Sequence, residues 1–94
     1  MVNKVIESVC AYFSVSKDDL LIKRSNDKIS DARMFAIYIL HCRHKKSVSF
    51  IAREFDILRS SVFSIVRKAK HRISIYSDDK DTCDAIISLI NSKD

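Results

Sequence analysis

Residues 47–72, SVSFIAREFDILRSSVFSIVRKAKHR, contain two amphipathic helical patterns separated by a short gap. The apolar positions of both patterns recur at the spacing of one helix face. They are Val48, Ile51, Ala52 and Phe55 in the first pattern, and Val62, Ile65, Val66 and Ala69 in the second. The gap between them is too short for anything except a turn from helix to helix. This stretch therefore predicts a helix-turn-helix over about residues 47–73, whose second helix runs from about Leu58 to Ile73 or slightly beyond.

The composition favours an all-α fold in a compact helical domain. The 94 residues contain no glycine and no proline. Left-handed turns, tight hairpins and phosphate-binding glycine loops are therefore disfavoured, because they depend on these residues. A chain of this length makes one domain with a single modest core, which we expect over residues 1–94. The longest apolar run is too short for a membrane span, and the first residues lack the apolar stretch of a secretory signal. Three widely spaced cysteines are expected to be reduced thiols in a cytoplasmic protein.

The other segments of the chain also show helical patterns. Periodicity predicts a first helix over residues 2–13, and a short turn over 16–22 that carries Leu20, Leu21 and Ile22 into the core. The polar residues 23–28 predict a basic loop. Ser30 or Asp31 is expected to cap a long helix ending near His44, which is apolar almost all round and so should form the buried centre. Ser47 is the expected N-cap of the next helix. Residues 77–81 are expected to break the chain before a last helix over 82–91.

The net charge of +5 is unevenly distributed along the chain. Residues 23–72 hold thirteen Lys or Arg and four acidic residues, a net charge of +9, whereas the two flanks together carry −4. A basic middle of this kind is typical of a protein that binds a polyanion. Together with the helix-turn-helix it indicates double-stranded DNA as the partner. A solvated basic helix on an ordinary helical bundle is the simpler alternative, but it does not explain the separation of charge.

The order of several short motifs resembles the C-terminal DNA-binding domain of the bacterial chromosomal replication initiator, DnaA. The motifs follow one another at nearly the family's spacing: Asp19-Leu20-Leu21, Lys23-Arg24, Ala32-Arg33-Met34, Arg53-Glu54-Phe55 and Ser60-Ser61-Val62. The resemblance covers nearly the whole chain. It implies the all-helical, Trp-repressor-like fold of that domain.

The resemblance also implies three groups of DNA-binding residues. Base edges in the major groove would be read at the start of the second helix, by Arg59, Ser60, Ser61 and Ser64. The minor groove would receive the basic loop, with Lys23, Arg24 and Lys28. Backbone phosphates would contact Arg33, Lys45, Lys46, Ser47, Arg67, Lys68 and Lys70.

Several departures from the family pattern alter the expected readout. The glycine of the family's turn is absent, and the turn is one residue shorter. Leu58 and Arg59 stand where the family has Asp and His, and the paired serines lack the methyl groups with which threonine could contact a thymine methyl. We therefore expect a different target sequence. The ATPase domain of the initiator is not among these residues, so we expect a stand-alone replication-related or transcriptional regulator without ATPase activity.

Other functions are less well supported by the sequence. His41, Cys42 and His44 lack the paired spacings of a zinc site, and nothing resembles a catalytic Cys–His arrangement. We therefore expect no enzyme activity, no metal and no other cofactor. The main alternative is a protein-interaction module, because Ile57, Leu58 and Phe63 are apolar where the family is polar, and the basic face could bind a replication initiator or another replication or transcription factor. Leu58 and Phe63 could contact either thymine methyl groups or a protein partner. Either a monomer or a homodimer is compatible with a helix-turn-helix protein.

Overall fold

The computed structural model describes residues 2–21 and 27–92, and this part of the chain is built from six helices without strands. The helices are α1 (Val2–Phe13), α2 (Lys17–Leu21), α3 (Asp27–Cys42), α4 (Val48–Phe55), α5 (Arg59–Ile75) and α6 (Ser77–Ser92). The all-α fold expected from the sequence is thereby confirmed. None of the described helices has the length and apolar character needed to cross a membrane.

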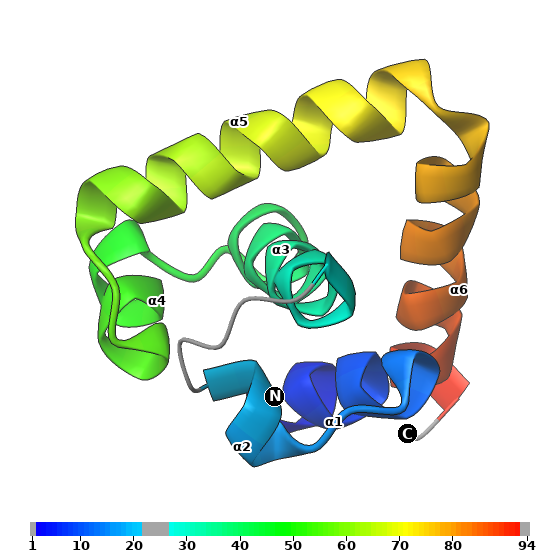
Figure 1. The fold of residues 1–94 in the computed structure, drawn as a ribbon, viewed down its shortest axis with the longest axis horizontal. Coiled ribbons are helices and arrows are strands. Elements are labelled where there is room, and N and C mark those ends of the chain that lie inside the picture. The colour runs from blue at the N-terminus through cyan, green and yellow to red at the C-terminus, as the bar shows by residue number, and fades with distance from the viewer. Residues whose placement is uncertain (1, 22–26, 93–94) are drawn as a thin grey trace.

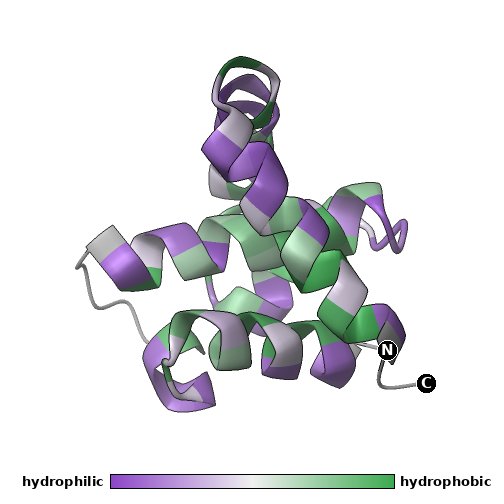
Figure 2. Ribbon diagram, turned by 90° about the vertical axis from the view of Figure 1, so that its right-hand side faces the viewer, coloured by the Kyte–Doolittle hydropathy of each residue, from purple (hydrophilic) through white to green (hydrophobic). Residues whose placement is uncertain are grey.

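Helix α3 forms the centre of the domain, as its apolar sequence predicts. Figure 1 shows it nearly end-on, with α5 across one side, α1 and α2 on the opposite side, and α4 and α6 at the two flanks. Its residues Phe35, Ile37, Ile39 and Leu40 are almost completely buried. Hydrophobic residues gather where the helices meet, and hydrophilic residues face outward (Figure 2). Burial of this apolar surface is the main force that holds the short helices together.

The start of α3 lies earlier than predicted. The helix begins at Asp27 rather than after Ser30 or Asp31, so Lys28 lies in its first turn and not in a loop. Ile29 explains the difference, because its side chain is 5% exposed and extends the buried face by one turn. The helix also ends at Cys42, slightly before the predicted end near His44. Leu20 is buried as expected, whereas the side chain of Leu21 and the predicted loop residues Ile22, Lys23 and Arg24 lie outside the described residues.

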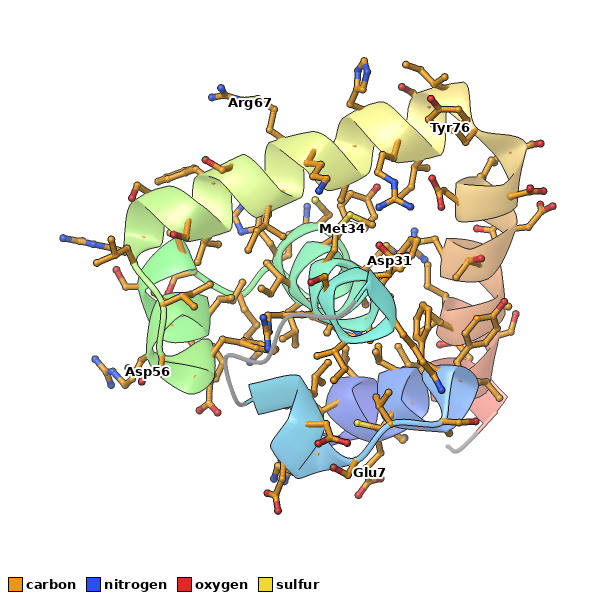
Figure 3. The ribbon with its side chains drawn as sticks, viewed as in Figure 1. Glu7, Asp31, Met34, Asp56, Arg67 and Tyr76 are labelled. Atoms are coloured by element: carbon orange, nitrogen blue, oxygen red, sulfur yellow. The ribbon has the colours of Figure 1, made fainter. Side chains whose placement is uncertain are left out.

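The predicted break over residues 77–81 is wrong. Helix α5 is interrupted only at Tyr76, whose backbone is extended (φ −106°, ψ 116°), and α6 begins directly at Ser77. Asp78 and Asp79 instead occupy the first turn of α6, where a carboxylate is favoured by the helix dipole. The two helices meet at a corner at Tyr76 (Figures 1 and 3).

Turns form in this chain without glycine. Ser14, Lys45 and Asp56 adopt positive φ angles of 56°, 58° and 52°, a conformation that costs a residue with a Cβ atom more than it costs glycine. Asp56 follows α4 in the left-handed conformation and donates its backbone N–H to the carbonyls of Ala52 and Arg53. It therefore ends the first helix of the helix-turn-helix in the way that glycine usually does.

Candidate nucleic-acid interface

The helix-turn-helix of α4 and α5 is held by a cap at one end and a shared apolar face. Ser47 is the N-cap of α4, as predicted, and its Oγ accepts a hydrogen bond from the Phe50 N–H at 3.1 Å. Ile51, Ala52 and Phe55 of α4 are buried, as are Val62, Val66 and Ala69 of α5. Helix α5 begins at Arg59, one residue after the predicted start. These contacts fix the angle at which α5 leaves the turn.

The first turns of α5 present the predicted base-reading residues. Arg59, Ser60 and Ser64 are exposed, and Ser61 is half-buried. The Arg59 guanidinium lies 3.5 Å from Ser49 Oγ, to which it donates a hydrogen bond. That contact places the cation beside α4 and leaves it exposed. The structure therefore brings together the four residues predicted for the major groove, with Ser61 the least accessible of them.

A first hollow of about 220 Å³ lies between the N-terminal half of α3 and the middle of α5. It is lined by Ser30, Asp31, Arg33, Met34, Ile65 and Lys68. Two of the predicted phosphate contacts, Arg33 and Lys68, thus share one hollow although they come from different helices. Arg33 also has a structural role, because its Nε donates a hydrogen bond to the Leu20 carbonyl at 3.0 Å and fixes α2. Burial lowers the pKa of its guanidinium from the usual value.

A second, larger hollow lies between the C-terminal half of α3, the start of α4 and α5. Its lining residues are Tyr38, His41, Cys42, Lys45, Lys46, Ser47 and Lys70, which include four of the predicted phosphate contacts. The His41 ring donates a hydrogen bond from Nδ1 to the Lys46 carbonyl at 3.1 Å and so holds the segment before α4. The Lys46 ammonium lies 5.5 Å from the centre of the Phe50 ring, a cation–π distance.

The two hollows lie on opposite sides of α5. Lys68 borders the first and Lys70 borders the second, and two residues along an α-helix differ by about 200° in direction. Helix α3 passes beneath α5 (Figure 1), so its two halves line different hollows. Between them, the exposed Arg67 points away from the body of the molecule (Figure 3). The arrangement is a basic helix with a depression along each flank, and both depressions are lined by cations, accompanied in the first by Asp31, which is paired with Arg72.

One cation of α5 faces inward and is paired. The Arg72 guanidinium binds both carboxylate oxygens of Asp79 at 3.1 Å and Asp31 Oδ1 at 3.0 Å. It also lies 3.6 Å from the Met34 sulfur. The hydrogen bonds that Arg72 donates, first to Asp79 and second to Asp31, raise its pKa. The sequence pattern alone counted Arg72 among the cations facing a polyanion, whereas in the structure it connects α5 to α6 and α3.

The remaining candidate residues are placed as follows. Lys28 is exposed on the first turn of α3, two residues from the first hollow. Lys23 and Arg24 lie outside the described residues. The three cysteines are unpaired thiols, and burial raises the pKa of Cys83 to about 11.

Sequence reasoning missed Tyr38 and His41 as neighbours of the phosphate-contact residues, because only the crossing of α3 and α5 brings them to the second hollow.

The fold and this exposed basic helix define a helix-turn-helix DNA-binding domain. Residues 2–69 match the family model described as the bacterial dnaA protein helix-turn-helix, and the chain belongs to this family. The matched family is a DNA-binding domain and is not itself catalytic. No curated protein sequence matches the chain. The matched range ends within α5, so the C-terminal turns of that helix and the whole of α6 lie beyond it.

Proposed function

We propose that this domain binds a specific duplex sequence with α5 in the major groove, and that it regulates replication or transcription by occupying that site. The observation that carries the proposal is the pair of basic hollows flanking α5. A helix with its side chains is about 10–12 Å across, and the major groove is about 12 Å wide. A helix that enters the groove therefore has one phosphate backbone on each side.

Each hollow would receive one of the two strands. On the first side, Arg33 and Lys68 provide cations for the strand that separates the major groove from the neighbouring minor groove. Lys28 lies next to this hollow, and Lys23 and Arg24 precede it in the chain, so all three remain candidates for the minor groove. On the second side, Lys45, Lys46, Ser47 and Lys70 would contact the other strand. Arg67 would reach a phosphate from the outer face of α5.

Base discrimination would come from the first turns of α5. Arg59 is the residue best suited to a bidentate contact with guanine, a pairing that typically contributes about 1–3 kcal/mol of discrimination. Ser60 and Ser64 lie on the same exposed region of the helix, and Ser61 lies at its edge. Their hydroxyl groups can donate to or accept from base edges.

The regulatory part of the proposal rests on DNA binding alone. The 94 residues contain no glycine and therefore no phosphate-binding loop of the usual kind. The domain would act through occupancy of its site, either by repression or by competition with an initiator for DNA.

Fluorescence anisotropy tests this proposal. The domain is titrated against a labelled duplex carrying an initiator-box sequence, a scrambled duplex, and the tightest duplex recovered from a random library, each over a salt series. If about six phosphates are engaged, log K should fall against log salt with a slope near −5. Lys68→Ala should reduce that slope by about 1 for every sequence, whereas Arg59→Ala should relax base preference. Lys80→Ala is the control, because Lys80 is exposed on α6.

A protein-interaction module is the second candidate. Leu58 is 73% exposed and Phe63 is 57% exposed beside the basic helix face, and such residues are common in protein interfaces. Absence of binding to every duplex at low salt would reject the DNA-regulator proposal and favour this candidate.

A further inference from the structure

One large exposed residue on α5 has no part in the DNA contacts proposed above. Phe63 is 57% exposed, whereas its neighbour Val62 is fully buried and fills the core position of that turn. The core therefore does not account for the aromatic ring. Ile75 and Tyr76 are similarly exposed, but they lie at the other end of α5, at the corner with α6.

Phe63 lies in a row of cations. Arg59, Phe63 and Arg67 are separated by four residues each, so they follow one another along one face of the helix. All three are exposed. If Arg59 and Arg67 contact DNA, the ring between them is held against the same groove. Cations on both sides of the ring also make this part of the helix unfavourable for a basic partner and favourable for a nucleic acid.

The major groove offers one apolar group to such a ring. Base edges there carry hydrogen-bond donors and acceptors, and thymine adds a 5-methyl group that apolar side chains, including phenylalanine, can contact. We infer that Phe63 is a specificity-determining residue that packs on a thymine methyl next to the base pair contacted by Arg59. This inference rests on the proposed function, because it requires α5 to lie in the major groove.

The test compares thymine with uracil, which lacks only the methyl group. The tightest duplex from the random library is synthesised with thymidine and with deoxyuridine at every thymidine position. The domain is expected to bind the deoxyuridine duplex about fourfold more weakly, the effect of losing one methyl-sized apolar contact. Phe63→Ala should bind the two duplexes equally. Ile75→Ala should keep the fourfold difference, and it is a matched control because Ile75 is on the same helix and 56% exposed.

Several results would overturn the inference while leaving DNA binding intact. They are equal affinity of the unmodified domain for both duplexes, a selected site without thymine beside its guanine, and a Phe63→Ala variant that keeps the fourfold difference. Circular dichroism and thermal unfolding establish that each variant is folded before it is compared. Failure of the unmodified domain to bind any duplex would reject the proposed function itself, and this inference with it.

Discussion

Replacement of Arg72 by alanine should destabilise the domain more than any other change of a charged residue on α5. The guanidinium binds Asp79 in a two-pronged contact and Asp31 in a single one, at 3.0–3.1 Å. The Arg72 and Asp79 side chains are only 25% and 16% exposed, while Asp31 is 41% exposed. The substitution would leave the Asp79 carboxylate without its cation in a mostly buried place.

The magnitude follows from this geometry. A hydrogen bond to a charged group typically contributes about 1.5–3 kcal/mol, and an exposed ion pair contributes below about 1 kcal/mol. The mostly buried contact with Asp79 is expected near the lower end of the range for hydrogen bonds to charged groups. The more exposed contact with Asp31 is expected to contribute as an exposed ion pair does. We therefore expect Arg72→Ala to lower the free energy of unfolding by about 2 kcal/mol. For a domain of this size that corresponds to a decrease of roughly 10 °C in Tm.

Urea denaturation at neutral pH measures the loss. Arg67→Ala is the matched control, since Arg67 is exposed on the same helix and its loss should change stability by less than about 0.5 kcal/mol. The double variant Arg72→Ala, Asp79→Ala should show a coupling energy of about 1 kcal/mol or more. In DNA titrations the variant with the larger effect should be Arg67→Ala. It should reduce the salt slope by about 1, whereas Arg72→Ala should leave the slope unchanged. A stability loss below about 0.5 kcal/mol for Arg72→Ala would refute the reasoning.

Three further predictions concern the fold. Asp56→Gly should raise the free energy of unfolding by about 0.5 kcal/mol in urea denaturation, because Asp56 has a φ of 52° that costs glycine less; a loss of stability would show that the Asp56 side chain contributes instead. Ser8 is fully buried, and its Oγ has no hydrogen-bond partner among the residues described, so Ser8→Ala should increase Tm, by an amount equivalent to about 1 kcal/mol; a decrease would indicate a partner for the hydroxyl. Burial, followed by the nearby Arg43 and Lys46, lowers the pKa of His44 below 6.5, so the unfolded chain binds more protons just below this pH and stability should decline as the pH falls from 6.5 toward the folded pKa. Denaturation curves at several pH values should show this decline, and His44→Gln should make it smaller; an equal decline in the variant would assign it to another group.

Local signals in the sequence were sufficient for the helix-turn-helix. The spacing of Ile51 and Phe55, and of Val62 and Val66, predicts one buried face on each helix. In the structure these four residues are buried. Ser47 was recognisable as a cap because its role depends on an N–H only three residues away. Features determined within one or two helical turns are those that a single sequence expresses most directly.

Features that depend on distant residues were not predictable in the same way. Nothing near Asp79 in the sequence indicates that this carboxylate pairs with Arg72. Arg72 was grouped with the DNA-facing cations for the same reason. The two hollows likewise depend on the crossing of α3 beneath α5, which brings Arg33 and Lys68 to one hollow and Lys45 and Lys70 to the other. The sequence identifies these basic residues but does not divide them between two sides of a helix.

The most direct test of the central claim, that α5 lies in the major groove between two phosphate backbones, is an NMR titration of the ¹⁵N-labelled domain with the selected duplex. We predict the largest chemical-shift changes at the backbone amides of Arg59, Ser60 and Ser64 and at residues lining both hollows, with little change along the exposed face of α6. Changes centred on α6 and the Tyr76 corner, or confined to one hollow, would contradict the account.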